Sequence, residues 1–404
     1  MRVLLSAYAC EPNQGSEQEV GWQRALHMLA LGDEVWVLTR SNSQTLIEAD
    51  PLSHSHGLRF IYYDLPGWAL KLKRHTWFRR VYFTFWQWGA YREASRQHRL
   101  TPFDSVYHVT FASMKFGSFM GRLGIPFVIG PIAGGERAPF RLRSSLPARW
   151  QAAELLRDLG ILIQRCSPFS RSAFAAADRI YVTTRESLRL IPRKWRFKTV
   201  VLLAIAANEC GARNIDRQQP DYPRFVYAGG LIYWKGAHLA IRALAQVRST
   251  TPGATLTLIG DGPTEQWLRA VAEQCGVAHA VEFAGRIPRE QLIDGFSHYT
   301  VLVFPSLHDS GGMVVLEALS RGTPVICLDL GGPSVIVNAS CGVVVPTENA
   351  DEAQTVIRLA NAMGFLGSLS AFEWARFSMG AITRAKELSW SGLTVNVAKR
   401  VGPE

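Results

Sequence analysis

The chain has 404 residues and a formal net charge of +11, from 44 Lys and Arg against 33 Asp and Glu. Residues 1–200 hold 28 of the basic and 15 of the acidic residues, so a basic first half is joined to a nearly neutral second half. The length is typical of about two domains. A hydrophobic content of 48% with 12 Trp excludes a disordered chain.

The six cysteines are scattered without a C-x-x-C pair, which argues against a disulfide scaffold and against a zinc site. The first apolar run ends at Glu11 and Pro12, too early for the core of a secretory signal. Charge or proline interrupts every apolar stretch well before the ~18 residues that a spanning helix needs. We therefore expect a cytoplasmic protein that is soluble or bound to a membrane surface.

Apolar runs in the first half alternate with stretches of helical spacing. The run Val3–Ala9 predicts a strand buried on both faces. After the turn-rich loop Glu11–Glu17, apolar residues from Val20 to Ala30 recur at helical spacing, which predicts a helix that stops at Gly32. Further strands are predicted at Glu34–Thr39, Leu58–Tyr63, Ser105–Val109, Pro126–Ile129 and Arg179–Val182.

The alternation restarts after the polar stretch Asn208–Pro223. A strand at Arg224–Ala228 is followed by the loop Gly229–Gly236 and then by a helix. Helices are predicted at Ala237–Val247 and Thr264–Gln274, and strands at Ala254–Ile259, Ala280–Phe283, Val301–Phe304 and Pro324–Leu328. Strands separated by helices predict an α/β protein with two doubly wound parallel sheets, in which ligands bind beyond the carboxyl ends of the strands.

The segment 305–326 carries the strongest chemical signal. A strand ends at Phe304, and the pair Gly311-Gly312 opens a helix whose free amides suit a diphosphate. Asp309 precedes that helix and Glu317 lies within it, so both carboxylates can accept hydrogen bonds from the hydroxyls of a sugar or a ribose. The alternative is that Asp309 only caps the helix and Glu317 is a solvated helix residue.

This segment resembles the signature of glycosyltransferase family 4, two acidic residues with seven between them, followed by Ala-Leu-x-x-Gly-x-Pro-Val. The resemblance implies the GT-B fold, two facing Rossmann-like domains with a cleft between them, and a retaining transfer from a nucleotide-sugar. It implies an acceptor-binding domain at residues 1–205, a donor-binding domain at 206–375, and a helical tail at 376–404 that crosses back to the first domain.

By this resemblance Glu317 binds the ribose and Asp309 binds the donor sugar. The family usually has Glu where this chain has Asp309, one methylene shorter. Gly311, Gly312 and Met313 are expected to bind the diphosphate at the start of the helix. In the loop after residue 228, the resemblance assigns Gly229, Gly230 and Lys235 to the diphosphate, although the family's usual Arg is here Gly230. Arg286 is expected near the base. Lys235 and Arg286 could also be ordinary surface cations.

Three loops or strand ends of the first half complete the candidate site. Gly15 and Ser16 open the first helix and, by resemblance, face the donor diphosphate. His108, at a strand end, is expected to contact the reacting sugar, and Gly135 and Glu136 are candidates for the acceptor side. The alternatives are an ordinary turn glycine and a structural histidine.

The same resemblance implies catalysis by positioning and by neutralising the departing diphosphate, and the residues fit this because no obvious nucleophile is present. The chain contains no Asp-x-Asp pair, so we expect no metal and no cofactor, with the nucleotide-sugar as a substrate.

Two basic stretches, residues 71–99 and 137–171, account for much of the charge excess, and aromatic residues interleave the first. They fit an anionic membrane surface that presents a lipid-linked acceptor, a nucleic acid, or a solvated face over a Trp-rich core. We favour the membrane and expect no nucleic-acid partner.

The sequence thus predicts a retaining glycosyltransferase that moves a sugar from a nucleotide-diphosphate-sugar to a glycan or lipid-linked acceptor in cell-surface polysaccharide biosynthesis. The protein would act at the inner face of the cell membrane. Two alternatives remain on the same scaffold: a non-catalytic basic protein that binds membrane or nucleic acid, and a nucleotide-sugar epimerase.

Overall fold

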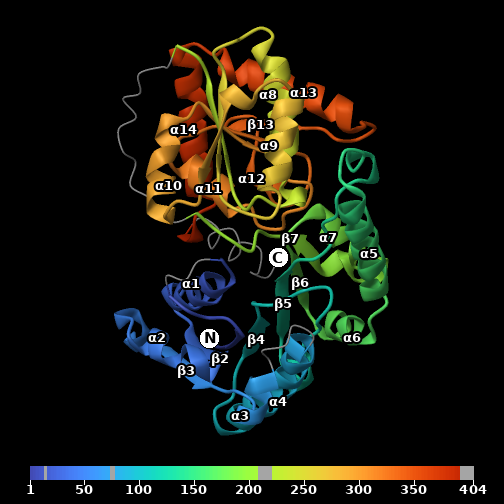
Figure 1. Ribbon diagram of the computed structural model, residues 1–404. Coiled ribbons are helices and arrows are strands. Elements are labelled where there is room, and N and C mark those ends of the chain that lie inside the picture. Colours follow the sequence, from blue (N-terminus) through green and yellow to red (C-terminus); the bar gives the residue numbers. More distant parts are fainter. Residues whose placement is uncertain (13–15, 73–77, 208–220, 392–404) are drawn as a thin grey trace. The chain divides into compact units, whose positions relative to one another are not determined.

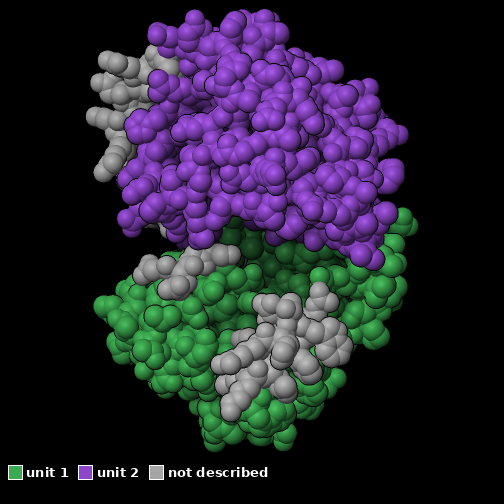
Figure 2. Space-filling model, in the orientation of Figure 1, with its two compact units in different colours: residues 1–135, 159–205 green, residues 136–158, 206–404 purple. Residues whose placement is uncertain are grey.

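The chain folds into two compact units (Figures 1 and 2). The structure is a computed structural model that describes residues 1–404 except 13–15, 73–77, 208–220 and 392–404. Unit 1 comprises Met1–Gly135 and Leu159–Ile205, and unit 2 comprises Glu136–Asp158 and Ala206–Glu404.

Unit 1 contains a seven-stranded sheet in the order β3-β2-β1-β4-β5-β6-β7, and each described pairing between its strands is parallel. The strands are β1 (Arg2–Ser6), β2 (Glu34–Thr39), β3 (Leu58–Tyr62), β4 (Ser105–His108), β5 (Phe127–Ile132), β6 (Arg179–Val182) and β7 (Thr199–Val201). The helices in this part of the chain are α1 (Ser16–Ala30), α2 (Gln44–Glu48), α3 (Gly67–Leu72), α4 (Phe78–Leu100), α5 (Ala148–Arg165), α6 (Pro168–Ala176) and α7 (Arg185–Leu190).

Unit 2 contains a six-stranded parallel sheet in the order β10-β9-β8-β11-β12-β13. Its strands are β8 (Arg224–Ala228), β9 (Thr255–Ile259), β10 (Val281–Gly285), β11 (Val301–Phe304), β12 (Val325–Leu328) and β13 (Gly342–Val345). Its helices are α8 (Ala237–Arg248), α9 (Glu265–Gln274), α10 (Arg289–Gly295), α11 (Met313–Ser320), α12 (Pro333–Ile336), α13 (Glu352–Gly367) and α14 (Ala371–Glu387), which lie on both faces of the sheet (Figure 1).

The predicted fold class is confirmed, because both sheets are parallel and most connections between their strands run through α-helices. The expected strands lie within one to three residues of the observed ones. The sequence analysis missed the last strand of each sheet, β7 and β13. Both are short edge strands with partly exposed residues, so neither has the long apolar run that marks a strand buried on both faces.

One segment of the expected first domain, residues 136–158, belongs to unit 2. Glu352, the first residue of α13, fastens this segment: its carboxylate accepts the Ser144 hydroxyl and the Ser145 amide, each at 3.0 Å, and pairs with Arg242 on α8. The described part of the expected tail, through residue 391, belongs to unit 2, where α14 packs on α11. Residues 392–404 lie outside the described part, and the crossing of the tail stays a prediction.

Candidate functional site

The loops that the sequence predicts to bind the donor lie at the carboxyl ends of the strands in unit 2. The Leu307 amide, in the loop after β11, donates a hydrogen bond to the Trp234 carbonyl, in the loop after β8, at 2.8 Å. This bond joins the two loops. The loop after β11 is in turn joined to the loop after β12, because Gly332 donates to the Asp309 carbonyl at 2.7 Å. This is the edge where ligands bind in doubly wound sheets.

Lys235 and Asp309 form an ion pair across two of these loops. Lys235 ends a 3-10 turn, Tyr233–Lys235, and its ammonium lies 5.3 Å from the centre of the Phe304 ring. The second oxygen of Asp309 accepts the amides of Gly311 at 3.0 Å and Gly312 at 3.2 Å. Asp309 therefore pairs with the same cation and accepts the same amides that the sequence assigned to a diphosphate.

Two glycines permit this arrangement. Gly312 precedes the first residue of α11, Met313, and adopts φ +78°, a left-handed conformation that other residues rarely take. Gly236 has φ +75°, and a side chain there would collide with the Pro305 carbonyl. Gly230 is not required for space in this way, because the atoms nearest to a Cβ built at this position are 3.9 Å from it. Its carbonyl accepts the hydroxyl of the buried Tyr227 at 3.0 Å.

Glu317 is mostly buried on α11 and pairs with Arg289, the first residue of α10, at 2.7 Å. Burial raises the pKa of Glu317, and Arg289 lowers it in part. Arg286 is exposed on the loop that leads to α10. The sequence analysis named Arg286 and missed Arg289. An arginine at the first position of a helix opposes the helix dipole, and that unfavourable placement was the signal available in the sequence.

A buried polar cluster lies behind the two loops. Glu154, which has no exposed surface, accepts the Tyr233 hydroxyl at 2.9 Å and the His308 ring at 3.0 Å. Arg143 lies 3.7 Å from its other oxygen. The ring of Trp234 stacks on His308 at 5.4 Å. Glu154 thus touches residues next to both Lys235 and Asp309, although sequence analysis found none of this cluster.

The charges in this cluster follow from burial and hydrogen bonding. Burial, the largest influence on Glu154, raises its pKa, but the hydrogen bonds from His308 and Tyr233 and the charge of Arg143 outweigh it and lower the pKa overall. Burial also lowers the pKa of His308, so the ring is neutral at neutral pH and donates its Nε2 proton to an ionised Glu154.

The candidate site residues in the first half of the chain lie in different environments. Gly15 lies outside the described residues, and Ser16 is the first residue of α1. His108 has no exposed surface, and its Nδ1 lies 3.1 Å from the Ser6 hydroxyl, so it is packed within unit 1. Burial lowers the pKa of His108 to about 4. The Gly135 amide donates to Ser187 within unit 1, and Glu136 is a buried residue of unit 2.

The aromatic residues of the basic stretch 71–99 divide into core and surface. Trp86 is fully buried and donates its indole proton to the Tyr63 carbonyl at 3.0 Å, and Tyr82 and Phe83 belong to the same core. Phe85 and Trp88 are exposed. The expected alternative of a Trp-rich core therefore accounts for part of this stretch.

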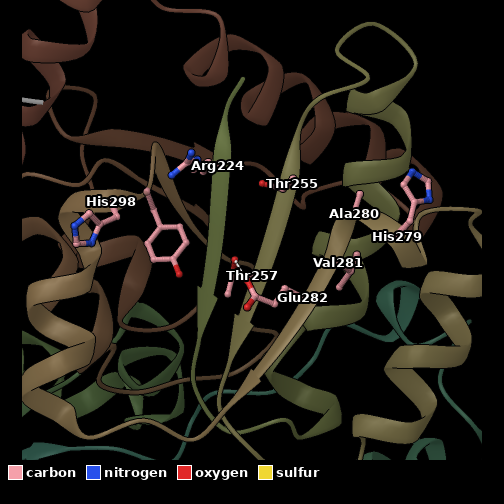
Figure 3. Close-up of a pocket in the computed structure, with 9 residues that line it drawn as sticks. Arg224, Thr255, Thr257, His279, Ala280, Val281, Glu282 and His298 are labelled. Carbon is pink, nitrogen blue, oxygen red and sulfur yellow. Dashed lines mark hydrogen bonds between the residues drawn. The ribbon is translucent and has the colours of Figure 1, made fainter. Parts of the chain in front are cut away.

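A hollow of about 360 Å³ lies at the opposite, amino-terminal end of the strands in unit 2 (Figure 3). Arg224, Thr255 and Val281, which begin β8, β9 and β10, line it with Glu282, whose carboxylate accepts the Thr257 hydroxyl at 3.1 Å. This hollow is separate from the loops of the candidate site. Among the described residues, no group of three or more His, Cys, Asp or Glu has a metal-binding arrangement.

The second half of the chain is similar to a known protein family. Residues 212–362 match the model of the family described as glycosyl transferases group 1. Glycogen synthase of Mycobacterium tuberculosis is 37% identical over 119 residues, which cover 29% of this chain and 29% of that protein. The match to this relative thus spans less than a third of its length.

Solved structures share the fold over nearly the whole chain. The lipopolysaccharide outer core galactosyltransferase WaaB has a TM-score of 0.60 at 13% identity and covers 99% of both chains. Anabaena Alr3699/HepE in complex with UDP and glucose has a TM-score of 0.54 at 15% identity, with 99% of both chains covered. At such identities the likeness concerns the fold alone. Residues 212–362 are thus similar to the glycosyl transferases group 1, and the two-sheet scaffold is of the GT-B type.

Proposed function

We propose that the protein is a retaining glycosyltransferase that moves a sugar from a nucleotide-diphosphate-sugar to a glycan or lipid-linked acceptor. The observation that carries the proposal is the convergence of the Lys235 ammonium and the Gly311 and Gly312 amides on one anionic group, here the Asp309 carboxylate. A donor diphosphate offers the same negative charge, and the dipole of α11 favours it.

The remaining groups have complementary roles in the proposed reaction. The Glu317 carboxylate accepts the ribose hydroxyls, and Asp309, displaced from Lys235 by the donor, accepts a hydroxyl of the sugar. The bond between the anomeric carbon and the diphosphate oxygen breaks, the acceptor oxygen bonds to that carbon on the same face, and the acceptor proton passes to the departing oxygen. Lys235 and the amides stabilise the negative charge that develops there. We propose that this needs no metal.

The fold neighbours and the charge distribution support the substrate classes. Alr3699/HepE binds UDP and glucose, and WaaB is described as a lipopolysaccharide galactosyltransferase, so a nucleotide-sugar and a cell-surface glycan or lipid are the classes to test. The basic residues of the first half favour an acceptor at the anionic inner face of a membrane.

Nucleoside diphosphate release from a panel of nucleotide-sugars tests the proposal. The wild-type protein should hydrolyse one donor slowly, and Glu317→Ala should abolish that release while Glu282→Ala, at the opposite end of the sheet, should not. Activity that survives in EDTA supports metal independence, and activity lost in EDTA and restored by Mg²⁺ overturns that part. Release from no donor favours a binding protein, and conversion of the donor to its epimer favours an epimerase.

A further inference from the structure

Helix α5 (Ala148–Arg165) exposes a continuous apolar stripe. Five large side chains on it are more than half exposed: Leu155 57%, Leu156 71%, Leu159 55%, Leu162 55% and Ile163 65%. At ~100° per residue these positions fall within a stripe about 120° wide, the width of the apolar face of an amphipathic helix. Such a face normally packs on a core, whereas here it faces outward.

The polar side of α5 is turned inward and is held there. Glu154 accepts hydrogen bonds from Tyr233 and His308, and Asp158 accepts the Arg143 guanidinium at 2.8 Å. Arg157 donates to the Glu136 carbonyl at 2.8 and 3.2 Å. These bonds fix the rotation of the helix about its axis, so the outward direction of the stripe is a built feature of the fold.

The exposed charges along this part of the chain have one sign. Between residues 137 and 172 the acidic residues are Glu154 and Asp158, and both are engaged in the buried cluster. Exposed arginines precede, flank and follow the stripe: Arg137, Arg141, Arg149, Arg165 and Arg171. Asp351, an exposed acidic residue outside the range 137–172, lines the same hollow as Leu155. Its carboxylate caps α13.

We propose that α5 docks on an anionic lipid surface, with its leucines among the acyl chains and its arginines at the headgroup phosphates. This deepens the proposed function, on which it rests for its purpose, because it gives the enzyme a surface that meets a lipid-linked acceptor. A leucine face bordered by arginine is the composition of an interfacial helix. Among the described residues no single helix is long and apolar enough to cross a membrane.

Vesicle binding tests the inference with matched variants. The triple variant Leu155→Ser, Leu159→Ser, Ile163→Ser should bind vesicles of phosphatidylglycerol and phosphatidylcholine about tenfold more weakly than wild type. A control triple, Leu46→Ser, Leu52→Ser, Ile357→Ser, removes similarly exposed residues from other elements and should bind as wild type does. Arg149→Gln, Arg165→Gln, Arg171→Gln should weaken binding to these vesicles, and wild type should not bind pure phosphatidylcholine.

A second measurement reports the position of the helix directly. Cys166 is exposed one residue beyond α5 and continues the stripe. In a variant with Cys210 and Cys275 changed to Ser, an environment-sensitive fluorophore on Cys166 should shift to the blue on anionic vesicles. Donor hydrolysis should be unchanged in every variant, which separates this inference from the proposed function.

Three results would overturn the proposal. One is wild-type vesicle binding by the α5 triple variant. Another is a fluorophore on Cys166 whose emission does not shift when the protein is bound to anionic vesicles. The third is a dimer in solution that the α5 variant converts to monomer without any loss of vesicle binding, since the stripe would then be an interface between copies of this chain.

Discussion

Asp309 joins two elements of the candidate site, because one of its carboxylate oxygens pairs with Lys235 and the other accepts the amides before α11. The carboxylate thus occupies a position suited to a phosphate group. It neutralises the cation and satisfies the amides of Gly311 and Gly312.

Lys235→Ala should lower kcat for donor hydrolysis about 100-fold or more, because the leaving diphosphate loses its side-chain cation. Lys235→Arg keeps the charge and should retain part of the rate. Steady-state kinetics with the identified donor measures both. Equal rates for Lys235→Ala and wild type would remove Lys235 from the mechanism.

Asp309→Asn should bind nucleoside diphosphate more tightly than wild type while its transfer rate falls. The neutral amide competes less well than a carboxylate for Lys235, so the cation is more available to the product. Isothermal titration with the product diphosphate gives the affinity. Weaker product binding by the variant would mean that Asp309 organises the amides more than it competes for them.

Arg289→Ala should move the acidic limb of the pH profile of donor hydrolysis to higher pH. Burial already raises the pKa of Glu317, and loss of the neighbouring guanidinium raises it further. The carboxylate that accepts ribose hydroxyls is then ionised only at higher pH. Arg286→Ala, on the loop that leads to α10 and outside this pairing, serves as the control and should leave the limb in place.

Glu154→Ala should cost about 3 kcal/mol of the free energy of unfolding, because Arg143 and the Tyr233 hydroxyl lose a buried partner. Urea unfolding measures this against Glu265→Ala, which removes an exposed pair with Arg269 and should cost under about 0.5 kcal/mol. Equal losses in the two variants would contradict the structural role of Glu154.

The same residue predicts a pH dependence of stability. Its pKa is lower in the folded chain than the value of about 4.3 for an unperturbed Glu. The stability that Glu154 contributes is therefore fully present above the unfolded value and is lost as the pH falls through the folded one. Glu154→Gln should flatten the acidic side of the stability curve between these limits.

Gly230→Arg should lower KM for the donor about tenfold, since it adds a second cation to the loop that we propose binds the donor diphosphate. The position has room for a side chain and no left-handed φ. Gly230→Ala tests the backbone alone and should leave KM unchanged. A KM that stays the same or rises in Gly230→Arg would indicate that the diphosphate does not approach this loop.

The sequence by itself determined most of the strands and the loops that carry Lys235, Asp309 and Glu317. Buried parallel strands need continuous apolar runs, and a tight strand-to-helix turn needs glycine, so both are visible along the chain. The notable misses were β7 and β13, which are short edge strands with partly exposed residues.

Only the tertiary structure decided where residues 136–158 pack and which way α5 faces. Apolar spacing reveals that α5 has an apolar side, but an amphipathic pattern does not say what that side meets. The answer depends on Tyr233 and His308, which are distant in sequence and hold Glu154 inward. Arg289 likewise became a neighbour of Glu317 only through folding, because their separation along the chain carries no information about their distance in space.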